Sequence, residues 1–194
     1  LVPSGASFIV KNKASGLVLD FGWVLGIDLW ASNGAPNQTW AINSVGTSGN
    51  PTPPGNGQQI SDGDYFITNQ YAGTVLDDPK GSLRSGLQII QDPLAGKSSQ
   101  KWRFTHQGSG FYTLQNLSSG QFLTSPNSST TAGIPLVQQP PANDDSQVWL
   151  LIPSNDSYLI QNKASGLVID FPWASGIDLW SLTGSDNQLW TVTP

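Results

Sequence analysis

The sequence of 194 residues contains no cysteine, no methionine and a single histidine, and only 11% of its residues are charged. Without cysteine, neither a disulfide framework nor thiol chemistry is available. The net charge is −5 and lysine and arginine do not cluster, so nucleic acid and anionic membrane surfaces are poor partners. No apolar run approaches the roughly 20 residues of a membrane-spanning helix, so we expect no membrane insertion.

Constellations typical of enzymes are also missing from the sequence. His106 lies in the stretch FTHQGSG, which shows neither a nucleophile nor the spacing of metal ligands. The acidic pairs Asp77-Asp78 and Asp144-Asp145 are adjacent along the chain, so their side chains diverge and do not form a glycosidase pair. We therefore expect no catalytic residue, no metal site and no cofactor.

The sequence is rich in turn residues and tryptophan, with 21 glycines, 14 prolines and eight tryptophans. Many turn residues and few helix formers predict an all-β protein built from short strands. A chain of this length can bury a core of its own.

Repeats organise the chain. Residues 8–40 and 158–190 match at 19 of 33 positions without gaps, and two fainter copies lie between them. Each unit opens with an apolar strand and Asn or Gln, passes through a small-residue turn that ends in Gly, and closes with Q-x-W. We expect four short strands per unit, which in unit 1 fall at roughly 7–12, 16–21, 27–31 and 39–44. Units 2, 3 and 4 begin at Tyr65, Phe111 and Tyr158.

A repeat of this length with a terminal Q-x-W resembles the ricin B-chain lectin family, which has the β-trefoil fold. The resemblance covers nearly the whole chain except a Pro- and Gly-rich segment, and it implies core positions for Trp40, Trp102, Trp149 and Trp190. A trefoil uses three units, whereas this chain has four. We therefore expect a trefoil with one extra repeat: unit 1 at residues 1–45, a linker at 46–62, and a lectin domain of units 2–4 at 63–194.

Residues suited to neutral sugars are concentrated in units 1 and 4. An aromatic ring packs on the apolar face of a pyranose, a carboxylate accepts hydrogen bonds from hydroxyls, and an amide both donates and accepts. Unit 2 keeps Asp77 but aligns Ile90 with the tryptophan and Ser99 with the asparagine, and unit 3 has Thr124, Val137 and Ser146. The sets, at identical spacings, are Asp20, Asp28, Trp30, Asn37 and Gln38 in unit 1, and Asp170, Asp178, Trp180, Asn187 and Gln188 in unit 4.

Strand alternation along GIDLW predicts that Asp28 and Trp30 share one face, while Ile27 and Leu29 face the core. The family resemblance implies roles for the rest. Asp20 and Asp170 would accept from sugar hydroxyls, and Trp30 and Trp180 would be stacking platforms. Asn37 and Asn187 would add a second hydrogen bond, and Gln38 and Gln188 would brace the site. Trp23 and Trp173 lie outside the family pattern and could form a second wall of the pocket or an interface contact.

The family most often binds galactose or N-acetylgalactosamine. The predicted function is therefore a lectin for such glycans with two equivalent sites, acting as an agglutinin and not as an enzyme. One alternative is a trefoil protease inhibitor acting through an exposed loop at residues 44–63. The other is a sugar-binding module of a larger toxin or glycosidase.

The fourth repeat leads to a prediction about oligomeric state, and the composition leads to one about cellular compartment. A lone unit would expose its inward face, so we expect a homo-oligomer, a dimer, formed by exchange of a near-identical element. A wider closed barrel of four units is the competing arrangement and would permit a monomer. The absence of cysteine and of a visible signal peptide favours the cytosol, with secretion as the alternative. Asn37 begins a glycosylation sequon, and a glycan there would block the unit 1 site, so we expect none.

Overall fold

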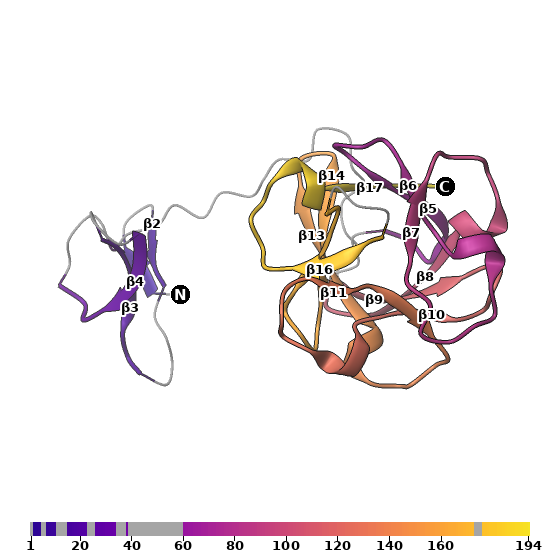
Figure 1. The fold of residues 1–194 in the computed structure, drawn as a ribbon. Helices are drawn as coiled ribbons and strands as arrows, with labels where there is room; N and C mark the ends of the chain where they lie inside the picture. Colours follow the sequence, from indigo (N-terminus) through magenta and orange to yellow (C-terminus); the bar gives the residue numbers. More distant parts are fainter. Residues whose placement is uncertain are drawn as a thin grey trace. The chain divides into compact units, whose positions relative to one another are not determined.

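The computed structural model describes residues 2–4, 7–10, 15–22, 26–33, 38, 60–172 and 176–194. The chain divides into two compact parts, Leu1–Gly46 and Thr47–Pro194. Strands and short 3-10 turns make up the regular structure of the described residues (Figure 1), so the prediction of an all-β protein is confirmed. No helix among these residues has the length and apolarity needed to cross a membrane.

The second part contains one hydrogen-bonded sheet of 13 strands. Short 3-10 turns lie between the strands, and η3, η5 and η6 carry the Q-x-W glutamines. The turns are η2 (Pro79–Gly81), η3 (Ser98–Gln100), η4 (Pro126–Ser128), η5 (Asp145–Gln147) and η6 (Asp186–Gln188). The strands are β5 (Gly63–Asn69), β6 (Val75–Asp77), β7 (Ile90–Asp92), β8 (Trp102–Gly108), β9 (Phe111–Asn116), β10 (Phe122–Thr124), β11 (Ile134–Pro135), β12 (Val137–Gln139), β13 (Val148–Ser154), β14 (Ser157–Asn162), β15 (Val168–Asp170), β16 (Asp178–Trp180) and β17 (Trp190–Thr193).

This sheet closes on itself. Neighbouring strands pair in the order β5-β8-β9-β13-β14-β17, and β17 returns to pair with β5. Each unit adds one hairpin pair, β6 with β7, β10 with β12 and β15 with β16. Closure leaves no unpaired edge in the barrel. This threefold repetition of barrel strands and hairpins is the β-trefoil that the sequence predicts.

A ring of backbone hydrogen bonds marks the threefold relation among units 2, 3 and 4. The amide of Ile89 donates to the carbonyl oxygen of Leu136 over 2.9 Å. The amide of Leu136 donates to Ile177, and that of Ile177 donates back to Ile89, both over 3.0 Å. All three side chains are fully buried. Units 2–4 therefore complete a trefoil without a further repeat.

Three of the Q-x-W tryptophans, Trp102, Trp149 and Trp190, are fully buried in this core. A buried indole N–H needs a hydrogen-bond acceptor. Each of these indoles donates to a backbone carbonyl oxygen in the second strand of its own unit. The predicted core role is confirmed for these three, whereas Trp40 lies outside the described residues. The acceptors are Leu76, Leu123 and Ile169, at 3.2, 3.1 and 3.0 Å.

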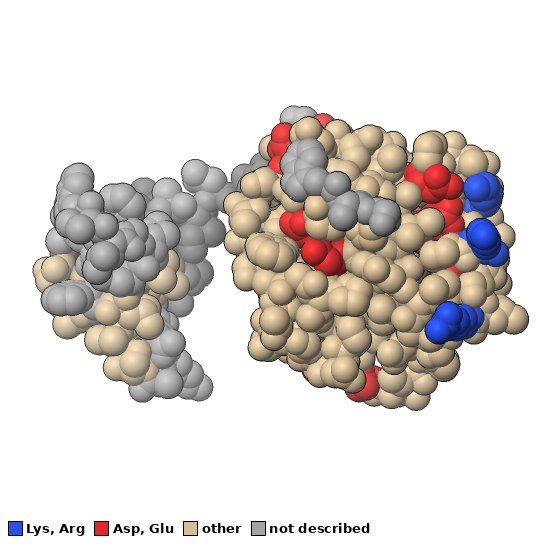
Figure 2. Space-filling view, in the orientation of Figure 1, with Lys and Arg blue, Asp and Glu red and all other residues tan. Residues whose placement is uncertain are grey.

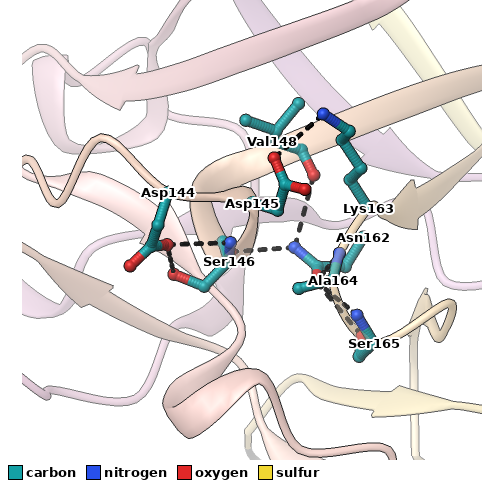
Figure 3. Close-up of polar contacts among 8 residues, drawn as sticks. All are labelled: Asp144, Asp145, Ser146, Val148, Asn162, Lys163, Ala164 and Ser165. Carbon is teal, nitrogen blue, oxygen red and sulfur yellow. Dashed lines mark hydrogen bonds and ion pairs between the residues drawn. The ribbon is translucent and has the colours of Figure 1, made fainter.

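In each of units 2, 3 and 4, an asparagine at the end of the first strand ties the unit to its neighbour around the barrel. In unit 4, the Oδ1 atom of Asn162 accepts the amides of Ala164 and Ser165, and its Nδ2 atom donates to the carbonyl oxygen of Ser146 over 2.8 Å (Figure 3). Asn69 and Asn116 make the corresponding bonds. Asn69 of unit 2 donates to the carbonyl oxygen of Asn187 over 2.9 Å, so unit 2 helps to hold a candidate site residue of unit 4.

Hydrogen bonds connect the chain to the barrel from Ile60 onward. The amide of Ile60 donates to the Tyr112 hydroxyl over 3.0 Å, and that hydroxyl donates to the Ile60 carbonyl oxygen over 2.9 Å. The Oδ1 atom of Asp62 accepts the amide of His106 over 2.8 Å. The rest of the expected linker lies outside the described residues.

The first part contains two strand pairs, β1 (Val2–Ser4) with β2 (Ser7–Ile9) and β3 (Val18–Gly22) with β4 (Gly26–Trp30). Three of the strands predicted for unit 1 coincide with β2, β3 and β4. The fourth, at 39–44, lies outside the described residues, and β1 was not predicted. The Leu29 side chain is 45% exposed in the single chain. The prediction that it faces the core of this chain is therefore wrong.

Candidate functional site

The β15–β16 hairpin of unit 4 brings the first candidate residues together. Its register places Asp170 opposite Asp178 and Trp180 opposite Val168. Side chains alternate along a strand, and Ile169 and Leu179 point into the core with no exposed area. Asp170, Asp178 and Trp180 consequently share the opposite face, where Trp180 is 44% exposed.

The η6 turn (Asp186–Gln188) supplies two amides to this face. The Nδ2 atom of Asn187 and the Nε2 atom of Gln188 both donate to Oδ1 of Asp170, each over 2.9 Å. Within the described part of the chain, no hydrogen bond reaches the other carboxylate oxygen of Asp170. These amides therefore fix the orientation of the carboxylate and leave its Oδ2 atom for a ligand.

The glutamine braces a loop in every unit. The Oε1 atom of Gln188 accepts the amide of Thr183 over 2.8 Å, and its Nε2 atom donates to Ser181 over 3.0 Å. Gln38, fully buried in unit 1, makes the same bonds to Asn33 and Ala31. The corresponding glutamines of units 2 and 3, Gln100 and Gln147, repeat them. Bracing is thus a property of the repeat, and it does not by itself mark a sugar site.

The candidate residues Asp170, Asp178, Trp180 and Asn187 line a cleft of about 360 Å³ in unit 4. Its volume is within the size range of small-ligand sites. Acceptors, amide groups and an aromatic ring converge on it, a set of groups suited to hydroxyls and to the apolar face of a sugar ring. Sequence reasoning missed three of its residues, Pro172, Thr183 and Ser185, because their side chains carry no pattern of their own. The cleft is lined by Asp170, Pro172, Asp178, Trp180, Thr183, Ser185 and Asn187.

Both carboxylates of the cleft are costly to ionise. Burial, together with the neighbouring Asp170 charge, raises the pKa of Asp178 to about 6. Burial also raises the pKa of Asp170, although the bonds from Gln188 and Asn187 oppose that shift. The Oδ1 atom of Asp178 is buried and accepts no hydrogen bond from the described residues. A ligand with hydroxyl donors would satisfy this oxygen.

A glycine of unit 3 lies directly against the Trp180 ring. The amide of Gly133 donates to the carbonyl oxygen of Leu179 over 2.8 Å. A Cβ atom at Gly133 would lie 3.1 Å from Cζ3 of Trp180, and the φ of Gly133 is +85°. The position of the Trp180 ring therefore depends on a neighbouring unit, which a pattern within one repeat does not reveal.

Unit 1 is described mainly by its backbone. In the β3–β4 pair Asp20 lies opposite Asp28, and Val18 lies opposite Trp30, the same register as in unit 4. The side chains of these three candidates lie outside what the structure describes, as do the whole of Trp23, Asn37 and Trp173.

The strand register corrects the alignment of units 2 and 3. Asp77 lies opposite Ile90 and Thr124 opposite Val137, as Asp170 lies opposite Asp178. The prediction that Ile90 and Val137 replace the tryptophan is therefore wrong, because the loops before these strands differ in length and the sequence does not reveal the pairing. The residues at the Trp180 position are Asp92 and Gln139.

Among the described residues, no cluster of three or more His, Cys, Asp or Glu side chains could hold a metal ion.

Comparisons with known proteins agree with this fold. The family profile "Ricin-type beta-trefoil lectin domain-like" matches residues 56–111 and 98–176, more than half of the chain. A search of curated protein sequences gives no match.

Several solved structures are similar to this chain. The designed threefold-symmetric protein ThreeFoil is 29% identical with a TM-score of 0.65, covering 69% of this chain and 99% of that one. The exo-β-1,3-galactanase 1,3Gal43A of Clostridium thermocellum is 25% identical with a TM-score of 0.64, covering 91% of this chain and 37% of that one. The Rhizoctonia solani agglutinin, at 23% identity and a TM-score of 0.59, covers 69% and 96% and supports the fold alone.

The closed trefoil, the Q-x-W core and the profile match lead to one conclusion: the chain belongs to the ricin-type β-trefoil lectin family, whose fold is that of carbohydrate-binding proteins.

Proposed function

We propose that this protein is a non-enzymatic lectin for galactose- or N-acetylgalactosamine-type glycans, with equivalent sites in units 1 and 4. The observation that carries the proposal is the unit 4 cleft, where an oriented carboxylate, an amide and an exposed indole converge. Unit 1 has the same residue types at identical spacings, with Asp20 opposite Asp28 as Asp170 is opposite Asp178.

In the unit 4 cleft each group has a task. The free oxygen of Asp170 accepts from sugar hydroxyls, and such charge-assisted bonds are about twice as strong as neutral ones. Trp180 receives the apolar face of the ring. The Nδ2 atom of Asn187 already donates to Asp170 over 2.9 Å, so its side-chain Oδ1 atom remains to accept from a neighbouring hydroxyl. Among the structures similar to this chain is an exo-β-1,3-galactanase, which favours a galactose-type ligand.

Calorimetry on aspartate variants tests the two sites. Loss of a charged acceptor costs on the order of 1.5–3 kcal/mol of binding free energy. Asp170→Ala and Asp20→Ala should each remove about half of the galactose-binding capacity, and the double variant should remain folded yet inert. Unchanged binding in the folded double variant contradicts the assignment, and a glycan array then identifies another ligand class.

Residues 1–45 are proposed as a fourth trefoil-type unit that exchanges with the near-identical unit 4 of a partner chain and forms a dimer. Units 2–4 already close a trefoil, and Leu29 is 45% exposed whereas its counterpart Leu179 has no exposed area. Covering apolar surface gains roughly 25 cal/mol per Å². Bivalent display would make the protein an agglutinin. Light scattering should give about twice the 20.7 kDa chain mass, and a monomer of 20.7 kDa at micromolar concentration refutes the exchange.

A second candidate function is a sugar-binding module of a larger enzyme. The match with the similar galactanase covers 91% of this chain but only 37% of the galactanase, which favours such a module. The cleft chemistry is the same in both cases, so the aspartate variants test both.

A further inference from the structure

A second cleft, of about 570 Å³, lies in unit 2, outside the site described above. The same positions of the repeat form both clefts, since the strand registers and the Q-x-W motif align them. Asp77 corresponds to Asp170, Asp92 to Trp180 and Lys97 to Ser185. The unit 2 cleft is therefore the counterpart of the unit 4 cleft with different walls.

The carboxylate at the base of this cleft has spare acceptor capacity. Asp77 is 3% exposed, and its buried Oδ1 atom accepts no hydrogen bond from the described residues. In unit 4 an asparagine and a glutamine donate to the corresponding oxygen. In unit 2 the asparagine position is Ser99, and Gln100 braces its loop as Gln188 does but does not donate to this oxygen of Asp77. A buried acceptor without a donor is costly, and a ligand hydroxyl in the cleft would supply the donor.

Charged side chains occupy the positions of the two tryptophans Trp173 and Trp180 of unit 4. Asp92 stands at the Trp180 position, and the alignment of DDPK with DFPW places Lys80 at the Trp173 position. Lys97 lies on the cleft with its Nζ atom 3.5 Å from Oδ2 of Asp92, both side chains being largely exposed. An exposed pair of this kind contributes little, because solvent screens both charges. Lys97 can therefore exchange Asp92 for a ligand anion at little cost.

The turn that carries Lys80 is tightly held. Lys80 has φ 59° and ψ 22° inside η2 (Pro79–Gly81). The next residue, Gly81, packs so closely that a Cβ atom there would overlap the Ser118 hydroxyl.

Figure 2 shows basic side chains beside acidic ones over the β6–β7 part of the trefoil, whereas acidic side chains over β16 have no basic neighbour on the face drawn. The two clefts thus differ in charge as well as in aromatic content.

We propose that the unit 2 cleft binds an acidic saccharide, with a ring hydroxyl donating to Asp77 and the ligand carboxylate accepting from Lys80 and Lys97. A neutral pyranose would find no stacking platform among the residues that line this cleft. A sugar carboxylate gains charge-assisted hydrogen bonds from two ammonium groups.

D-Galacturonate and D-galactose provide a matched pair of ligands, because they differ only in the carboxylate at C6. Calorimetry on the Asp20→Ala/Asp170→Ala protein, which lacks both proposed neutral-sugar sites, should show galacturonate binding about tenfold more tightly than galactose. Raising the ionic strength from about 0.05 M to about 0.5 M should reduce that preference, since exposed charges are screened.

Lysine variants then assign the preference to the cleft. Lys80→Gln/Lys97→Gln should abolish it. Lys163→Gln should leave it intact, because Lys163 forms a comparable exposed ion pair with Asp145, at 2.9 Å, outside the cleft (Figure 3). Equal affinity for the two sugars, no binding of either, or a preference that survives the double lysine substitution overturns the proposal.

If the double aspartate variant does not fold, the unchanged chain can be titrated and followed by NMR. The amides of Ser98 and Ser99 should shift at about tenfold lower concentrations of galacturonate than of galactose. No shift of these amides with galacturonate overturns the proposal. Failure of galactose to bind in unit 4 would contradict the proposed function and leave this test unaffected.

Discussion

Units 1 and 4 are near copies in sequence, yet equivalent side chains have different surroundings. Gln38 and Gln188 are both fully buried and hold their loops by the same bonds. Leu179 has no exposed area, whereas Leu29 is 45% exposed. Bonds within a unit follow from its own sequence, while burial of the inward face requires neighbouring repeats. A single trefoil repeat therefore specifies its hairpin and its brace but not its core.

The largest expected effect compares the two leucines. Leu179→Ala removes a fully buried side chain and should lower the free energy of unfolding by about 2–5 kcal/mol. Leu29→Ala should cost less than about 1 kcal/mol at protein concentrations where the chain is monomeric. Urea denaturation of both variants measures the difference. Equal losses at every concentration would show that the inward face of unit 1 is covered within a single chain, whereas a loss that grows with concentration would support the dimer.

The next effect concerns the aromatic platform, which unit 3 completes for unit 4. Gly133→Ala should weaken galactose binding by unit 4 roughly threefold to tenfold, because the added Cβ displaces Trp180. Gly166→Ala is the matched control: its φ of +72° imposes similar backbone strain, but a Cβ there meets nothing within 4 Å. Both variants should lose about 1–2 kcal/mol of stability. Equal losses of affinity would assign the effect to strain alone.

A smaller effect follows from the raised pKa of Asp178. The carboxyl has an ordinary pKa of 3.8, raised to about 6 in the folded chain. Between these values the folded state binds more protons than the unfolded state, so the free energy of unfolding falls as pH rises. Asp178→Asn should flatten this decline, making the variant more stable than the parent at pH above about 6 but weaker in sugar binding. Parallel thermal-stability profiles of the two proteins from pH about 3.5 to about 7.5 would contradict the assignment.

The smallest effect on the stability of the trefoil is expected from removing unit 1. Residues 60–194 keep Ile60 and Asp62, which are hydrogen-bonded to the barrel. This fragment should fold, melt at the same temperature as the trefoil transition of the full chain, and bind galactose at one site. It should no longer agglutinate cells, since it presents only the unit 4 galactose site. A fragment that fails to fold would show that the trefoil needs unit 1.

The sequence predicts the trefoil well because its signals are local. Q-x-W motifs, glycine-ended turns and alternating strands place the core tryptophans and the candidate residues of unit 4. The equivalence of Ile90 and Val137 with Trp180 was wrong, because loops of unequal length hide which residues face each other across a hairpin. Gly133 could not be found from a pattern within one repeat, since its contact with Trp180 joins two units.

The sequence by itself determined the three repeats of the trefoil, the buried indole of each described Q-x-W motif, and the set of polar and aromatic residue types that units 1 and 4 share. These features depend on side-chain type and strand alternation within some forty residues. Tertiary structure decided which three repeats close the ring through Ile89, Leu136 and Ile177, and which residues form the charged walls of the unit 2 cleft. Those outcomes depend on contacts between distant segments, which become defined only when the barrel closes.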